Sequence, residues 1–249
     1  MRGTVVTSMT ALMALSTVWL APTLASAHIS VSSGPGFANT TQEINFSVGH
    51  GCTDANGVQS DTSSVTIEIP AGVTSVRAAA NAFGKVTVTR ALVNNVSTVT
   101  AVTWTKAPGD VLSGDDSFYK LTIRAKVPNA PFTTVYFPTH QTCTTSTGAV
   151  LPVVDWVGTA PPVADAGVAA EPAPALLVLP ARVPGWNKVT VPVAVAGDKL
   201  ASLFADAQIV WKGTAAFSAN PATTEQIKTT SGVTVLAALA AGDEIWVKY

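Results

Sequence analysis

The stretch Q-E-I-N-F-S-V, residues 42–48, has apolar side chains at Ile44, Phe46 and Val48 and polar side chains between them. Because successive side chains of a strand point to opposite faces of a sheet, this alternation predicts a strand with one buried face. Strands are also predicted further along the chain, at residues 63–69, 85–89, 96–104, 121–127 and 135–137. Short strands with turn residues between them predict an all-β, immunoglobulin-like β-sandwich over residues 28–158.

The composition excludes several classes of protein. The chain has 249 residues, of which 47% are hydrophobic and 12% are charged, and its formal net charge is -1. Without a basic excess to neutralise phosphates, we expect no nucleic-acid binding. The hydrophobic content is too high for an intrinsically disordered chain, and charged residues are too sparse for a coiled coil.

Residues 1–27 have the pattern of a signal peptide. Arg2 precedes an apolar stretch, and the small-residue motif A-S-A follows at residues 25–27. Cleavage after this motif would make His28 the first residue of an exported protein, located in the periplasm, outside the cell or on the cell surface. An uncleaved N-terminal anchor is the alternative, although the apolar stretch is short for a spanning helix. We expect no transmembrane span after the signal peptide.

The C-terminal third has a different composition. Residues 159–179 are rich in Ala and Pro and predict a linker, and residues 180–249 predict a small, mainly-β module. Within the module, Asp198 is expected to cap the N-terminus of a short helix over residues 198–204.

Three tryptophans, Trp186, Trp211 and Trp246, are expected to build the core of this module. A fold of roughly 70 residues needs large apolar groups to be stable. A sugar-stacking platform is the alternative role for these side chains.

The chain has two cysteines, Cys52 and Cys143. In an exported protein we expect them to form a disulfide, worth on the order of 4 kcal/mol in the chain-entropy model. The alternative, in which both thiolates bind a metal, is disfavoured because the chain has no C-x-x-C pair.

A mature N-terminus at His28 would have special ligand chemistry. A terminal His offers a free α-amine and an imidazole nitrogen on one residue, and this chelate suits the tetragonal geometry of Cu(II). The remaining histidines, His50 and His140, lie close in sequence to the two cysteines, so a disulfide would bring them near each other. Each is either an ordinary partly exposed His or an additional metal ligand.

Five segments occur in a characteristic order: A-H-I-S-V at 27–31, V-G-H-G-C at 48–52, V-T-I-E-I-P-A-G-V at 65–73, V-Y-F-P-T-H-Q-T-C at 135–143 and V-D-W-V-G at 154–158. Over about residues 28–158, this order resembles the YcnI-type copper-binding family of exported bacterial proteins.

The resemblance implies a copper site called a monohistidine brace. The amine and imidazole of His28 would bind Cu(II), and Asp155 and Trp156 are the best matches for the family's carboxylate and its tryptophan beside the metal. Neighbouring residues of a regular strand point to opposite faces, so both reach one copper ion only at a bulge or a strand end. Glu43 and Glu68 are the fallback carboxylates.

We therefore expect a non-catalytic, exported Cu(II)-binding protein for copper trafficking or scavenging, with copper and other copper-trafficking proteins as partners. All three Met residues lie in residues 1–27, so the mature chain has no thioether ligand for Cu(I). One alternative is an oxidative copper enzyme similar to lytic polysaccharide monooxygenases, with His50 or His140 as a second imidazole. The other is a surface adhesion or carbohydrate-binding protein.

Overall fold

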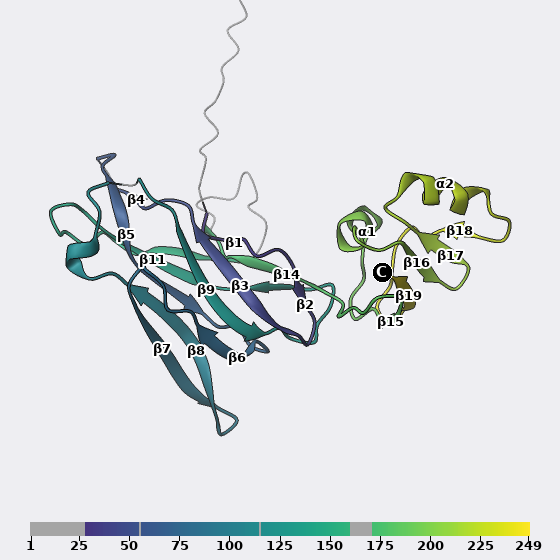
Figure 1. Ribbon diagram of the computed structural model, residues 1–249, viewed down its shortest axis with the longest axis horizontal. Coiled ribbons are helices and arrows are strands. Elements are labelled where there is room, and N and C mark those ends of the chain that lie inside the picture. Colours follow the sequence, from purple (N-terminus) through teal and green to yellow (C-terminus); the bar gives the residue numbers. More distant parts are fainter. Residues whose placement is uncertain (1–27, 55, 115, 160–170) are drawn as a thin grey trace, which may run out of the picture.

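The structure, a computed structural model, describes residues 28–249 except residues 55, 115 and 160–170. The predicted signal peptide, residues 1–27, lies outside the described residues. Figure 1 shows a larger sandwich of strands joined to a smaller module that contains the C-terminus. The prediction of an all-β sandwich followed by a small, mainly-β module is confirmed.

Two sheets form the sandwich. The first has the strand order β1-β3-β9-β6 and the second the order β13-β12-β11-β5-β8-β7, with β4 paired to β5. A small third sheet has the order β10-β14-β2. The bounds are β1 Ser30–Val31, β2 Gly36–Phe37, β3 Thr41–Val48, β4 Cys52–Thr53, β5 Gln59–Glu68, β6 Thr74–Ala78, β7 Lys85–Val93, β8 Val96–Thr105, β9 Tyr119–Lys126, β10 Thr134–Tyr136, β11 Thr139–Thr144, β12 Val154–Gly158, β13 Glu171–Pro172 and β14 Ala175–Leu179. One 3-10 turn, Pro108–Asp110, connects β8 to β9.

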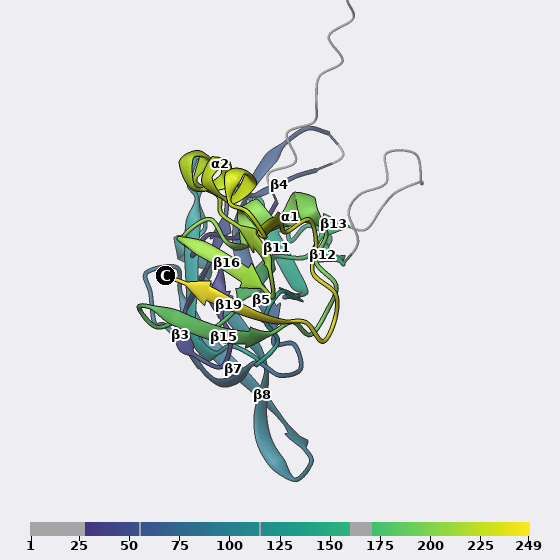
Figure 2. The same cartoon turned by 90° about the vertical axis from the view of Figure 1, so that its right-hand side faces the viewer.

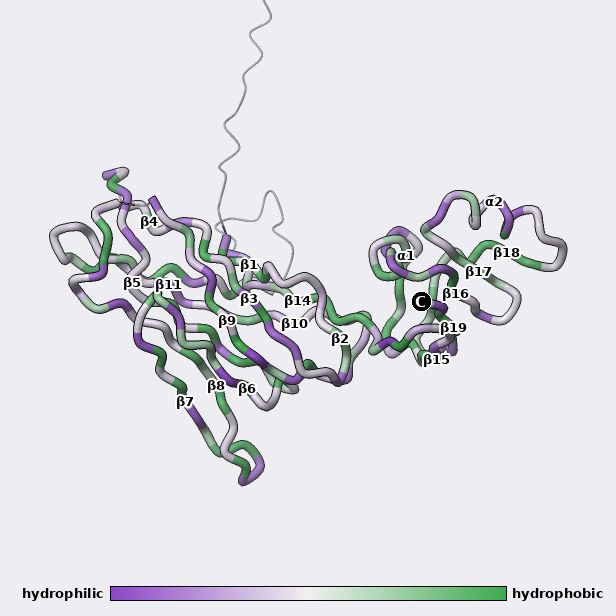
Figure 3. Tube along the Cα trace, in the orientation of Figure 1, coloured by the Kyte–Doolittle hydropathy of each residue, from purple (hydrophilic) through white to green (hydrophobic). Residues whose placement is uncertain are grey.

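The alternating residues of the opening stretch fill the space between the sheets. Ile44, Phe46 and Val48 of β3 are fully buried and contribute to one core. Trp104 and Phe137, from the second sheet and its flank, complete this core. Figure 3 shows hydrophobic and hydrophilic residues alternating along the strands, as burial of one face requires.

The predicted linker is wrong for residues 171–179. These residues form β13, which pairs in parallel with β12, and β14, which pairs with β10 and β2. The Ala and Pro content suggested an extended segment, and the backbone is indeed extended. It is incorporated into the sandwich because long-range neighbours accept its hydrogen bonds, which local composition does not reveal.

The C-terminal module has a five-stranded sheet with the order β15-β19-β16-β17-β18 and two helices. Figure 2 shows β15, β19 and β16 side by side, with α2 beyond β16. The bounds are β15 Trp186–Thr190, α1 Gly197–Leu203, β16 Ile209–Lys212, β17 Ala215–Phe217, α2 Pro221–Thr229, β18 Thr234–Val235 and β19 Glu244–Lys248.

The helices differ in part from the expectation. The predicted short helix is present as α1, but Ala196 is its N-cap and Asp198 lies in its first turn without a capping hydrogen bond. The sequence did not predict α2. Its start is nonetheless well marked, since Asn220 accepts a capping hydrogen bond from the backbone N–H of Ala222 at 2.9 Å and Pro221 follows the cap.

The expectation that three tryptophans build the module's core is wrong. The buried side chains are mainly aliphatic, among them Val189, Val210, Ile245 and Val247. Trp186 and Trp246 are 49% and 48% exposed, and Trp211 is half-buried. In β19 the run I-W-V places apolar side chains on both faces of the strand, so the sequence alone does not tell which face is buried.

The module packs directly against the end of the sandwich. Phe132 and Leu179 of the sandwich share a core with Phe204 of the module, and the ring centroids of Phe132 and Phe204 are 5.6 Å apart. The guanidinium of Arg182 lies over the rings of Phe37 and Tyr249. No helix among the described residues is long and apolar enough to span a membrane.

Candidate metal centre

His28 is held at the beginning of the sandwich by the residues that follow it. Ile29 is 2% exposed and belongs to the sandwich core, and β1 pairs with β3 from Ser30 onward. The His28 side chain itself is 37% exposed. An imidazole is therefore fixed in position at the surface, where an ion or a partner can reach it.

Two side chains flank the His28 ring. The Trp156 ring contacts it edge to face, with the centroids 5.5 Å apart. A carboxylate oxygen of Glu171, Oε2, lies 3.7 Å from His28 Nδ1. Trp156 and Glu171 are register partners of the parallel pair β12 and β13, so the same pairing places both beside His28.

Buried polar groups fix the position of Trp156. The side chain is 4% exposed, and its indole N–H donates to Gln141 Oε1 at 3.1 Å. Gln141 in turn donates to the backbone carbonyl of His50 at 2.9 Å and to Thr62 Oγ1 at 2.8 Å. Because each buried donor has a partner, the ring beside His28 has one defined orientation.

The predicted disulfide is confirmed and lies beside this network. Cys52 and Cys143 are bonded, with their Cα atoms 5.8 Å apart and a separation of 91 positions in sequence. The bond joins β4 to β11, the strand that contains Gln141. Close packing continues at Gly51, where a Cβ would lie 1.8 Å from the carbonyl oxygen of Ser60, so only glycine fits.

Asp155 does not lie beside His28, contrary to the expectation. It occupies the opposite face of β12 from Trp156, and its side chain is 57% exposed. Its Oδ1 accepts a hydrogen bond from His140 Nδ1 at 2.6 Å. The physical reason is the regular alternation of β12, which sends the two side chains of the D-W pair in opposite directions.

His140 and Glu68 belong to this outer cluster with Asp155. His140 Nε2 lies 3.1 Å from Glu68 Oε1, so both ring nitrogens face carboxylates. The hydrogen bond with Asp155, with a further contribution from Glu68, raises the pKa of His140 above its ordinary value of 6.5. Engaged in this way, His140 is not a second imidazole for the His28 site.

The other candidates are placed as follows. Glu43 is exposed on β3, opposite Arg124 of β9. The ring Nδ1 of His50 makes a short contact with the carbonyl oxygen of Gly51, and the backbone of His50 is linked to Trp156 through Gln141. That His50 adds a metal ligand stays a prediction.

Glu171 is the residue that sequence reasoning missed. It lies in a segment taken for a linker, and nothing in its neighbourhood resembles a ligand motif. The one local feature that could have drawn attention to Glu171 is that it is one of few acidic residues in this Ala- and Pro-rich stretch.

The described side chains alone do not make a complete chelate. Among the residues that the structure describes, no group of three or more His, Cys, Asp or Glu side chains converges to hold a metal ion. The α-amine that cleavage before His28 would create is a further nitrogen donor on the same residue.

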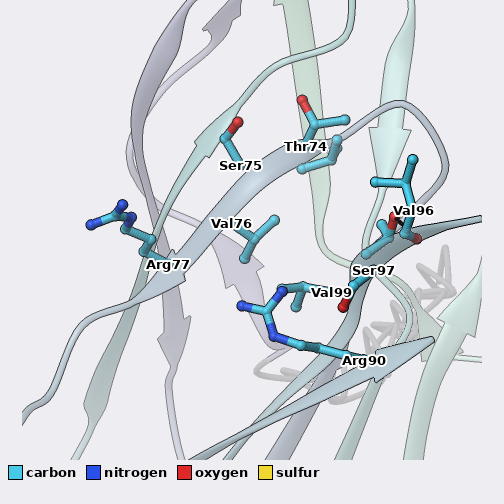
Figure 4. Close-up of a pocket in the computed structure, with 10 residues that line it drawn as sticks. Thr74, Ser75, Val76, Arg77, Arg90, Val96, Ser97 and Val99 are labelled. Atoms are coloured by element: carbon cyan, nitrogen blue, oxygen red, sulfur yellow. Dashed lines mark hydrogen bonds between the residues drawn. The ribbon is translucent and has the colours of Figure 1, made fainter. Parts of the chain in front are cut away.

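A separate pocket of about 600 Å³ lies between β6 and the β7–β8 hairpin. Figure 4 shows its lining, with Arg77 and Arg90 as the charged side chains. Its lining includes neither a histidine nor a carboxylate, and it shares no residue with the His28 site.

Comparison with known proteins gives a similar solved structure and a matching family model. A crystal structure of an uncharacterized protein from Nocardia farcinica, described as having an immunoglobulin-like fold, is 25% identical and covers 62% of this chain and 99% of its own, with a TM-score of 0.46. No functionally curated protein matches the chain. A family model described as "Domain of unknown function (DUF1775)" matches residues 28–179, a range that includes β13 and β14. Because this match spans more than half of the sequence, the chain belongs to the DUF1775 family.

Proposed function

We propose that this protein is an exported Cu(II)-binding protein that acts in copper trafficking or scavenging. The observation that carries the proposal is the placement of His28 between the Trp156 ring and the Glu171 carboxylate. Copper is the cargo, and no chemical step is assigned to the protein.

The donor atoms fit Cu(II). Nδ1 is the ring nitrogen that can form a six-membered chelate with the α-amine of the same residue, and Nδ1 is the atom that faces Glu171. Metal–nitrogen and metal–oxygen bonds to such ligands are about 2 Å long, so one ion can bond to two atoms that are 3.7 Å apart. Amine, imidazole and carboxylate together are nitrogen and oxygen ligands of the kind that Cu(II) accepts.

Trp156 would limit access to the ion. Its ring covers one side of the His28 imidazole and is held there by Gln141. The His28 side chain is 37% exposed, which suits transfer of copper to another protein by ligand exchange. His140 is engaged with two carboxylates, so His50 is the remaining candidate for the second imidazole that an oxidative enzyme of the lytic monooxygenase type would need.

Electron paramagnetic resonance of the copper-loaded chain tests the proposal. The mature chain starting at His28 is compared with the same chain selectively acetylated at its α-amine. The acetyl group removes the α-amine from the chelate and leaves every side chain in place. We expect the nitrogen hyperfine pattern to change and Cu(II) affinity to fall by at least about a hundredfold, equivalent to about 2.7 kcal/mol.

Two results would count against the proposal. One is an unchanged spectrum and affinity in the chain with the acetylated α-amine. The other is mass spectrometry of the exported protein that shows a mature start other than His28. Ascorbate-dependent peroxide formation by the copper-loaded mature chain would instead favour the oxidative enzyme.

A further inference from the structure

The C-terminal module exposes three tryptophans on one face of its sheet. Trp186, Trp211 and Trp246 come from three neighbouring strands, β15, β16 and β19, and together with Gly213 they line an open pocket of about 480 Å³. Nearly half of the surface of both Trp186 and Trp246 is exposed. Contiguous exposed apolar surface of this kind on a folded domain marks a binding site.

The strand register places the three rings in a row across the sheet. Trp211 is directly opposite Trp246 in the β16–β19 pair. Trp186 is opposite Lys248, two residues along β19 from Trp246, so it is a diagonal neighbour of Trp246. Since adjacent strands are about 4.8 Å apart, the row crosses roughly 10 Å of sheet.

These rings are not needed for the core. Val189, Val210, Ile245 and Val247 of the same strands fill the opposite face, and all four are buried. Burying these aliphatic side chains stabilises the module, whereas nearly half of the surface of Trp186 and Trp246 gains nothing from burial.

The polar groups on this face are paired. Lys188 and Glu244 form an ion pair of 2.8 Å, and the Lys248 ammonium lies 6.0 Å from the centre of the Trp186 ring. The pocket lining itself contains indole rings and glycine, with no charged side chain. This near balance of charge suits an uncharged ligand that has both apolar faces and hydroxyl groups.

We propose that this face, the tryptophan face, binds an uncharged polysaccharide of β-linked pyranose units. The C–H groups on one side of a pyranose ring are slightly positive, and they stack on the electron-rich face of an indole. The sugar hydroxyls can then hydrogen-bond to Lys188, Glu244 and Lys248 beside the rings. A flat, ribbon-like β-linked chain matches a row of rings on a sheet. A protein partner is less favoured, because the lining has no charged side chain to pair with one.

The proposal is independent of copper, and its test uses the metal-free full mature chain. The probes are insoluble cellulose and chitin in pull-down assays and their soluble hexasaccharides in titrations that follow tryptophan fluorescence. We expect binding to at least one of the two polysaccharides, with a change in emission. Trp246→Ala and Trp186→Ala should each weaken it at least tenfold.

Phe118→Ala is the control, because Phe118 is an exposed aromatic residue of the sandwich, 63% exposed, and lies outside the tryptophan face. It should leave binding unchanged. Circular dichroism of each variant checks that the module remains folded, and the more conservative Trp246→Phe should retain part of the affinity.

Several results would overturn the proposal. These are no binding to either polysaccharide, binding that survives in the triple tryptophan-to-alanine variant, preferential binding of a proline-rich peptide, or a dimer of this chain that the same substitutions dissociate.

Discussion

The tryptophans of the sandwich and those of the C-terminal module lie in opposite environments. Trp104 and Trp156 are buried, and their indole N–H groups donate to Ala79 O at 3.3 Å and to Gln141 Oε1 at 3.1 Å. Trp186 and Trp246 stand on an open sheet face. The same residue type thus fills a core in the sandwich and forms an open surface in the module. In the core, the indole is buried and its N–H has a hydrogen-bond acceptor within the protein.

The comparison also separates two kinds of site. At His28 a single buried ring is fixed by a hydrogen-bond network and shields one exposed imidazole. On the tryptophan face, several rings are presented together and the supporting core lies beneath them. A small ion needs a few atoms held in place, whereas an extended ligand needs area.

The sharpest way to break this comparison is to remove one tryptophan from each environment. Trp104→Ala leaves a large cavity in the core and should lower the free energy of unfolding by about 3–5 kcal/mol. Trp246→Ala should lower it by less, about 1 kcal/mol, because nearly half of the ring is exposed in the folded protein. Urea unfolding followed by circular dichroism measures both. Similar losses in the two variants would mean that the module's tryptophans are structural.

The next prediction compares two neighbouring residues of β11, Gln141, which accepts the hydrogen bond of Trp156, and Thr142, which does not. Gln141→Leu leaves the Trp156 N–H without its partner in a buried site and removes one hydrogen bond of the Thr62 hydroxyl, so stability should fall by about 1–3 kcal/mol. Thr142→Ala, on the outward side of the same strand, should cost less. Urea midpoints of the two variants compare them, and equal midpoints would argue against a role for the network.

Two carboxylates, Asp155 of β12 and Glu171 of β13, test the assignment of the proposed copper site. Glu171→Gln should weaken Cu(II) binding by the mature chain about tenfold, or about 1.4 kcal/mol, because it removes a charged oxygen donor beside His28. Asp155→Asn removes the same charge from the outer cluster and should leave the affinity unchanged. Competition titrations with a chromophoric chelator measure both. If Asp155→Asn weakened Cu(II) binding more than Glu171→Gln, Asp155 and not Glu171 would be the carboxylate ligand.

The smallest expected effect concerns the outer cluster in the copper-free protein. The pKa of His140 is raised in the folded state by Asp155 first and then by Glu68, so protonated His140 stabilises the fold. This contribution is complete below the unfolded pKa of about 6.5 and is lost as the pH rises through the higher folded value. Since the pair is partly exposed, it is worth less than about 1 kcal/mol.

Unfolding of the wild type and of His140→Gln between about pH 5.5 and about pH 9 measures this effect. The wild type should have its greatest advantage over the variant at the acidic end of the range. An advantage that grows toward alkaline pH would contradict the assigned direction.

Local patterns were enough for much of the fold. Alternation in β3, β5, β8 and β9 predicted strands because burial of one face imposes a period of two. The two cysteines predicted their own pairing. The sequence also named His28 and Trp156, which the structure places in contact.

Other features depend on pairings between distant segments. Glu171 reaches His28 only because β13 pairs with β12, and no local pattern around Glu171 signals that pairing. Asp155 and Trp156 are neighbours in sequence, yet the pleat of β12 sends them to different clusters.

By itself, the sequence determined the longer strands of the sandwich, the disulfide and the identity of the residue that follows the predicted cleavage motif. Each of these follows from a local periodicity or from a residue type. Only the tertiary structure decided which carboxylate lies beside His28 and which face of the module carries its tryptophans. Both depend on strand register, and a shift of one residue in register exchanges the two faces of a strand without altering its composition.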